Sequence, residues 1–497
     1  MADAQQERGL SVIGRRGVLA GILAGVAAPL WAEPPSVVPR PPRRPAPGED
    51  RATRRLIEAA KLSGAFAYAV ADRKTGRILS ARNETLLLPP ASVTKAITAL
   101  YALEKLGPDH RFVTRVMRRG EVVAGRLEGD LYLVGGGDPD LDTDRLGDLV
   151  AQLAASGIRQ ITGRFIACDG ALPARFQIAA DQPDFLGYNP AICGLNLNYN
   201  RVNLEWKRAA DGWSLAMDAR GERFVPPVRM ATVELALRER PIFAYRPGEG
   251  TDHWTVAQAA LAEPGSRWLP VRHPGLYAAE VFATLAAAQG VQLAQPTLAA
   301  HPPEGAVEVA THRGDPLTDV LRAMLKYSTN LTAEAVGLAS SGAGTLEGSA
   351  AAMTDWARRR FGIAGVFGDH SGLGSHSRIS AADLVQVMVR AEQARHGALL
   401  AGLLREQGLT DDEGKSIKGS PVRIRAKSGT LNFVSNLGGY LAGGSRDLAF
   451  AVMTADPDRR AAVPLDQREN PEGGKGWTRR ARRLHQAMIR RWSEAYL

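Results

Sequence analysis

Cysteines, metal-binding spacings and long apolar runs are scarce or missing in this 497-residue sequence. The two cysteines, Cys168 and Cys193, form no Cys-x-x-Cys pair, and no His-Glu-x-x-His segment occurs. We therefore expect no metal site and no cofactor. Beyond the N-terminus, no stretch reaches the roughly 18 uncharged apolar residues of a membrane-spanning helix, which excludes a polytopic membrane protein. The cysteines allow a disulfide in an oxidising compartment, but their spacing does not establish one.

The composition is that of a globular protein, with 45% hydrophobic and 23% charged residues and a net charge of +10. Much of the positive excess lies in residues 471–497, so the charge is local and we expect no nucleic-acid partner. This tail predicts a final helix with one apolar seam and a solvated basic face. The alternative is peripheral contact of the basic face with an anionic membrane or wall surface. The seam consists of Trp477, Ala481, Leu484, Met488 and Trp492.

The N-terminus has the pattern of an export signal rather than of folded structure. Arg15 and Arg16 precede an apolar run over residues 17–32, which is short for a membrane span. We expect an export signal over residues 1–32, a Pro-rich linker over 33–50 and a periplasmic location. The paired arginines indicate twin-arginine export, with a general secretory signal and an uncleaved anchor as alternatives.

Strand patterns occur near both ends of the remaining chain, and helical patterns lie between them. We expect strands at 65–71, 77–81, 422–431, 435–442 and 448–454, and helices at 91–106, 278–289, 317–326, 331–339 and 350–360. Residues 108–270 are rich in strands and turns. This order predicts one α+β domain formed by residues 51–107 and 271–497, with residues 108–270 inserted into it.

Ser92 and Lys95 form a Ser-x-x-Lys sequence at the start of the first predicted helix. Residues three positions apart share a helix face, so the hydroxyl and the amine come within hydrogen-bond reach. The amine acts as a base only if desolvation or a second cation lowers its pKa from about 10.4. The helix N-terminus also offers backbone N–H groups to a developing oxyanion. Taken alone, a helix-capping serine beside an exposed lysine would explain this sequence as well.

Two further short sequences complete a set. Ser328 and Asn330 form the Ser-x-Asn sequence of the chain, between two predicted helices, and Lys427-Ser428-Gly429-Thr430 ends a predicted strand. Each alone is an ordinary turn or strand end. Lys74-Thr75-Gly76 is excluded as the third element because it precedes the serine and lies in a predicted hairpin turn. A Ser-His-Asp triad is also excluded, since Asp369, His370 and Ser371 are consecutive and cannot converge.

The order and placement of these three stretches are those of β-lactamases and penicillin-binding proteins. Together with residues 134–139, 195–200 and 370–373, the sequence resembles the class C low-molecular-mass penicillin-binding proteins, the D-alanyl-D-alanine carboxypeptidase/endopeptidase family. The resemblance implies a penicillin-binding/serine β-lactamase-like transpeptidase domain of the α+β class, with a large β-rich insertion after the nucleophile helix. The chain departs from the family pattern at Ser428, where threonine is usual, and at His370, where glycine is usual.

The resemblance also implies roles for the residues. Ser92 would be acylated, with Lys95 as its base. Ser328, helped by Lys427, would pass the proton to the leaving amine. Asn330 would bind Lys95 and the substrate amide. Residues 428–430, Ser428, Gly429 and Thr430, would bind the substrate, and Lys427 and Ser428 would contact its carboxylate. The backbone N–H groups of Ser92 and Thr430 would form the oxyanion hole. Asp169 would contact the amino group of the stem peptide's diamino acid, although a turn-forming aspartate is an equal alternative.

We expect a serine D-Ala-D-Ala carboxypeptidase or D,D-endopeptidase that acts on peptidoglycan stem peptides and is inhibited by β-lactams. One alternative is a β-lactamase or esterase on the same scaffold, which the insertion and the lack of an evident extra carboxylate for deacylation disfavour. Another is a non-catalytic wall-binding protein, which the complete set of chemical residues disfavours.

Overall fold

A computed structural model describes residues 50–411 and 413–497. The export signal predicted for residues 1–32, and the linker up to residue 49, lie outside the described residues. Among the described residues, no helix combines the length and the apolar character that crossing a membrane requires.

Strands from the two ends of the described chain form one six-stranded antiparallel sheet. The N-terminal hairpin and the three C-terminal strands are those predicted from the sequence. Since β1 pairs with β18, residues almost 400 positions apart in the chain are neighbours in this sheet. The spatial order is β15 (Glu406–Gln407), β16 (Arg423–Leu431), β17 (Val434–Ala442), β18 (Leu448–Ala455), β1 (Ala65–Asp72) and β2 (Ile78–Arg82).

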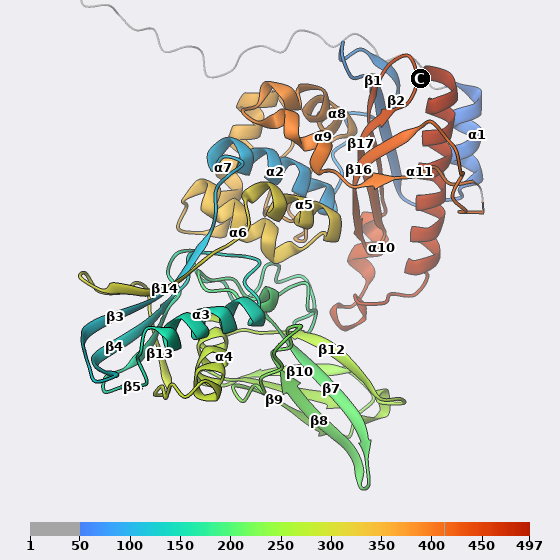
Figure 1. Cartoon of the computed structure of the whole chain (residues 1–497). Helices are drawn as coiled ribbons and strands as arrows, with labels where there is room; N and C mark the ends of the chain where they lie inside the picture. The colour runs from blue at the N-terminus through green and yellow to red at the C-terminus, as the bar shows by residue number, and fades with distance from the viewer. Residues whose placement is uncertain (1–49, 412) are drawn as a thin grey trace, which may run out of the picture. The chain divides into compact units, whose positions relative to one another are not determined.

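Both faces of this sheet are buried. In β1 the large side chains of Phe66, Tyr68 and Val70 point to one face, and alanines at the alternate positions point to the other. Helices α1 (Arg51–Ala59) and α11 (Gly474–Tyr496) cover the first face (Figure 1). The second face packs against α2 (Thr94–Lys105), α5 (Leu317–Tyr327), α6 (Asn330–Ser341), α7 (Leu346–Phe361), α8 (Ala381–Arg390) and α9 (Leu400–Leu403).

The C-terminal helix α11 has the predicted apolar seam. All five seam residues are buried, and the Trp492 ring lies 5.5 Å from the Tyr68 ring and 5.9 Å from the Phe450 ring, between centroids. Of the arginines between them, Arg479, Arg480, Arg482 and Arg483 are exposed, while Arg490 and Arg491 are half-buried. The seam therefore packs α11 on the sheet, and this packing fixes the direction of its basic face.

The segment after α2 forms separate sheets with a core of its own. A mixed sheet has the order β13 (Pro296–Ala299), β6 (Phe165–Cys168), β4 (Arg126–Val134), β3 (Val113–Val123) and β14 (Val307–Arg313), with β5 (Gln160–Ile161) on β4. Two three-stranded sheets follow, one of β10 (Phe243–Pro247), β11 (Asp252–Ala257) and β9 (Ala231–Ala236), the other of β12 (Gly265–Pro270), β7 (Arg201–Ala209) and β8 (Gly212–Asp218).

Contacts of residues 274–313 favour a later end of the insertion than the predicted residue 270. Helix α4 (Pro274–Ala288) contributes to the core of the inserted segment, β13 pairs with β6, and β14 pairs with β3. We therefore propose an insertion that runs from residue 108 to about residue 314, because backbone pairing rather than hydropathy defines its end.

Two local features of the insertion were not settled by the sequence. Helix α3 (Thr143–Ala155) lies in a region that we expected to be strand-rich, and the Asp142 side chain caps it by accepting from Arg145 N. Cys168 and Cys193 are both buried and are not bonded to each other.

The packing of α11 on the sheet predicts the effect of Trp492→Ala. Removing this buried ring should lower the free energy of unfolding by about 3–5 kcal/mol, since it leaves a cavity against Tyr68 and Phe450. Chemical denaturation measures the change. Arg480→Ala, an exposed position on the same helix, should change it by less than about 0.5 kcal/mol. Equal effects of the two substitutions would contradict this packing.

Candidate active site

Ser92 lies in a short 3₁₀ turn, η1 (Ala91–Val93), directly before α2. The Asn436 side-chain amide on β17 donates to the carbonyls of Pro89 and Pro90, each at 2.8 Å. Ala91 has a φ of +49°, a conformation that a residue with a Cβ seldom adopts. The turn is thus held to the sheet immediately before the serine.

The amine of Lys95, one helical turn after Ser92, has three acceptors. Lys95 Nζ lies 3.0 Å from Ser92 Oγ, 2.7 Å from Asn330 Oδ1 and 2.8 Å from the Ser371 carbonyl. The side chain is fully buried. The structure therefore brings Ser92, Lys95 and Asn330 together, as the sequence predicted.

Burial is the main influence on the charge of Lys95. Desolvation lowers the pKa of Lys95 to about 8, while the negative charges of Glu334 and Asp369 act in the opposite direction. With a pKa of about 8, about a tenth of this amine is neutral at pH 7. The neutral form is the one that can accept a proton from Ser92.

Two buried carboxyl groups hold the loop that supplies the Ser371 carbonyl. Glu334, one turn after Asn330 on α6, accepts from the backbone N–H groups of His370 and Ser371 at 3.0 and 2.8 Å. Asp369 accepts from the N–H groups of Gly372 and Gly374. Burial raises the pKa of Glu334 to about 8 and also raises that of Asp369.

His370, one of the two departures from the pattern that the sequence resembles, packs against α6. Its Nε2 lies 2.7 Å from Ser349 Oγ, and its ring occupies the place where a Cβ at Gly337 would lie. Burial lowers the pKa of His370 to about 3, so the ring is neutral. The histidine ring contacts Ser349, Met353 and Gly337, so it packs the loop against α6 and α7.

Ser328 and Lys427 form the second pair of the site. Lys427 Nζ donates to Ser328 Oγ at 2.9 Å and to the Ser428 carbonyl at 2.8 Å. Ser328 ends α5 with a φ of +62°. Burial, followed by the nearby charge of Lys95, lowers the pKa of Lys427 well below its usual range.

The end of β16 passes very close to the serine. A Cβ at Gly429 would lie 2.6 Å from the Pro90 carbonyl oxygen and 3.0 Å from Ser92 N, so only glycine fits there. Ser428 and Thr430 are exposed at alternate positions on either side of Gly429. Strand β15 pairs with residues 424 and 425 only, so among the described strands this edge of 428–430 has no ladder partner. It is open to an extended substrate.

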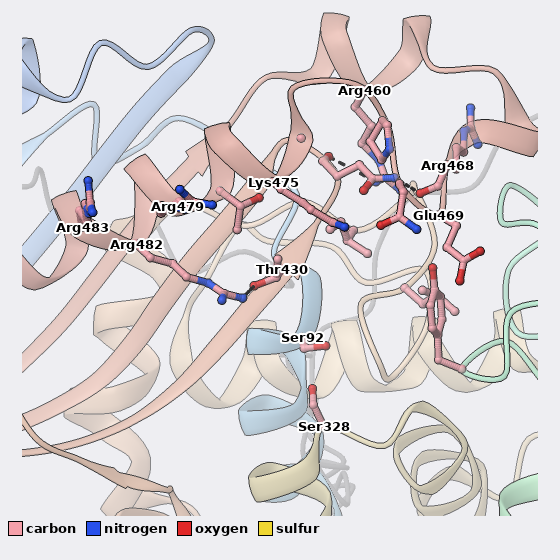
Figure 2. Close-up of a pocket in the computed structure, with 18 of the residues that line it drawn as sticks. Ser92, Ser328, Thr430, Arg460, Arg468, Glu469, Lys475, Arg479, Arg482 and Arg483 are labelled. Atoms are coloured by element: carbon pink, nitrogen blue, oxygen red, sulfur yellow. Dashed lines mark hydrogen bonds between the residues drawn. The ribbon is translucent and has the colours of Figure 1, made fainter. Parts of the chain in front are cut away.

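A cleft of about 830 Å³ is lined by Ser92, Ser328, Asn330 and Thr430. Figure 2 shows the two serines and Thr430 in it. Its wall includes Tyr188 of the insertion, whose carbonyl accepts from Asn330 Nδ2 at 2.9 Å. Asp169 is not among the residues that line it. The Asp169 carboxylate instead lies against Gly275 and the Cys193 thiol, and burial raises its pKa.

Three residues of the site, Glu334, Asn436 and Tyr188, were not predicted from the sequence. Glu334 could have been, because a glutamate four positions after Asn330 within the apolar stripe of α6 is an unusual residue for a buried helix face. Asn436 and Tyr188 carried no such signal, because their role depends on which carbonyl or amide lies opposite them in the folded chain.

The fold and these contacts define a serine acyl-enzyme hydrolase of the penicillin-binding type. The model of the D-Ala-D-Ala carboxypeptidase 3 (S13) family matches residues 52–472. The chain belongs to this family. It is a serine hydrolase of the D-Ala-D-Ala carboxypeptidase type, as the three motifs predicted.

Two sequence relatives carry the name of this activity, and one solved structure shares the fold. The D-alanyl-D-alanine carboxypeptidase of Actinomadura sp. is 29% identical over 435 residues, covering 80% of this chain and 79% of the relative. The D-alanyl-D-alanine carboxypeptidase DacB of Haemophilus influenzae is 24% identical over 387 residues, covering 73% and 80%. The crystal structure of penicillin binding protein 4 from Haemophilus influenzae superposes with a TM-score of 0.68 at 19% identity, over 88% of this chain and 99% of that one. This last similarity confirms the fold.

The lowered pKa of Lys95 predicts a pH dependence of acylation. The acylation rate should rise with pH through an inflection near 8, because the ammonium form holds its proton and the neutral amine accepts one. Stopped-flow acylation by a β-lactam measures this profile, and Lys95→Arg, which stays protonated, should abolish the reaction. A rate that is flat from about pH 6 to about pH 10 would contradict the assignment of the base.

The close approach of β16 predicts the effect of Gly429→Ala. The added methyl group must push the strand away from Ser92, and we expect acylation to slow by about 10²-fold, as small displacements of reacting groups do. Gly402→Ala is the matched control, because nothing lies within 4 Å of a Cβ there. Acylation kinetics of both variants measure the difference, and a Gly429→Ala enzyme as fast as the wild type would disprove the constraint.

Proposed function

We propose that Ser92 is the nucleophile of a D,D-peptidase acting on peptidoglycan stem peptides, and that β-lactams acylate the same hydroxyl. The observation that carries this proposal is the 3.0 Å hydrogen bond between Lys95 Nζ and Ser92 Oγ, made by a fully buried amine. A buried amine with a lowered pKa beside a hydroxyl is the arrangement that activates a serine.

In the proposed reaction, neutral Lys95 takes the proton of Ser92 as Oγ attacks the carbonyl of the penultimate D-Ala. The oxyanion accepts from the backbone N–H groups of Ser92 and Thr430, a contribution of about 2.7–4 kcal/mol per donor. The C–N bond then breaks, and Ser328, supported by Lys427, relays to the leaving amine the proton that Lys95 took from Ser92, so that Lys95 is neutral again for the attack of water. Water hydrolyses the ester and regenerates Ser92.

The remaining residues position the substrate in this proposal. Asn330 holds Lys95 and the substrate amide, while Lys427 and Ser428 bind the terminal carboxylate beside Gly429. A contact of Asp169 with the diamino acid of the stem peptide stays a prediction, for which the position of its carboxylate against Gly275 offers no support.

We further propose that the protein works outside the cytoplasmic membrane, in the periplasm, after export through a twin-arginine signal. A substrate in the cell wall and the Arg15-Arg16 sequence before an apolar run support this location.

Labelling with fluorescent penicillin tests the nucleophile. The wild type should be labelled covalently and Ser92→Ala should not, because no other side chain in the cleft pairs a hydroxyl with Lys95. Digestion of purified sacculi followed by mass analysis of the muropeptides identifies the product, as loss of a terminal D-Ala and loss of a cross-link give different masses. Equal labelling of both proteins would refute the assignment.

A further inference from the structure

One wall of the cleft is strongly basic. Six of the side chains that line it are arginine or lysine, and four of them project from α11 (Figure 2). These four, hereafter the α11 basic face, are Lys475, Arg479, Arg482 and Arg483.

The α11 basic face results from helical spacing combined with the buried seam. Positions 475, 479, 482 and 483 are separated by four, three and one residues, which places them on one side of a helix. The seam holds the other side against the sheet. Arg480 is exposed but does not line the cleft.

Three acidic side chains, Asp411, Glu413 and Glu469, line the same cleft, and Glu469 pairs with Arg267 at 2.7 Å. Within residues 50–411 and 413–497, no aspartate or glutamate oxygen lies within 4 Å of the four cations of the α11 basic face. The face therefore has no ion-pair partner among the described residues. Cations gathered on one helix face repel each other unless an anion binds between them.

A direct contact joins the α11 basic face to the catalytic strand. Arg482 Nη2 donates to Thr430 Oγ1 at 3.3 Å. Ser428 and Thr430 are the exposed side chains of the strand end proposed to bind the terminal carboxylate. That carboxylate belongs to the part of the substrate that leaves, so the α11 basic face lies on the leaving-group side.

A single leaving D-Ala would not use this surface. Its one carboxylate is already served by Lys427 and Ser428 in the proposed function. From Lys475 to Arg483 the helix rises about 12 Å, which is the length of several peptide residues rather than of one amino acid. The leaving strand of a cross-linked stem peptide is long enough, and it carries several carboxylates.

We propose that the α11 basic face is a binding site for the carboxylates of the leaving peptide strand, and that it favours cleavage of cross-links over release of a terminal D-Ala. The inference rests on the proposed function. In both reactions the amide bond at the carbonyl of the penultimate D-Ala breaks, the acyl group passes to Ser92, and water then hydrolyses the ester. The preference for cross-links over a terminal D-Ala therefore arises from binding of the leaving group alone.

The test compares two substrates in the full-length enzyme: a cross-linked muropeptide dimer and an uncross-linked pentapeptide. Arg479→Gln combined with Arg482→Gln should lower kcat/KM for the dimer about 10-fold, while kcat/KM for the pentapeptide changes less than about twofold, as expected for the loss of two exposed charges. Added salt should weaken the wild type's preference for the dimer and leave the variant's preference unchanged.

Arg480→Gln is the matched control and should keep the wild-type ratio of the two kcat/KM values. An unchanged ratio in the double variant, or an equal loss on both substrates, would overturn the inference. Labelling by fluorescent penicillin separates this outcome from failure of the proposed function, since the double variant should still be acylated at Ser92. If the wild type itself were not acylated, the proposed function would fail first.

Discussion

The chemistry of this protein depends on one buried amine. Lys95 has no exposed surface, yet its Nζ is surrounded by a hydroxyl, an amide oxygen and a backbone carbonyl. Desolvation disfavours the ammonium form of Lys95. The three acceptors and the nearby carboxyl groups of Glu334 and Asp369 stabilise that form and offset part of the cost of burial. The amine is therefore balanced between its two protonation states, which is what proton transfer to and from Ser92 requires.

This balance requires three distant stretches of the chain to meet around the Lys95 amine. Asn436 ties the turn before Ser92 to the central sheet, and Gly429 lets β16 pass within contact of the Ser92 backbone. Gly372 gives the loop beyond Asp369 the same close approach to Ala91. Small residues and amides thus set the catalytic geometry, and the large apolar cores on both faces of the sheet make it rigid.

Much of this arrangement could be predicted from the sequence, for identifiable physical reasons. The strands near both ends, the helices between them and the α11 seam follow from period-2 and period-3.6 patterns, and three short motifs indicated Ser92, Lys95, Ser328, Asn330 and Lys427. The C-terminal end of the proposed insertion could not be predicted from the sequence, because β14 joins the insertion through backbone pairing with β3. Asn436 and the orientation of the α11 basic face depend on tertiary contacts that leave no periodic signal.

The most direct test of the central claim is an NMR titration of the lysine side chains in protein labelled with ¹³C at Cε, with Lys95→Arg to assign the resonance. We expect the Lys95 amine to titrate near 8, well below the value of about 10.4 for an exposed lysine. A Lys95 resonance that titrates together with the exposed lysines would show that the amine stays charged near neutral pH, and Lys95 could then not act as the base.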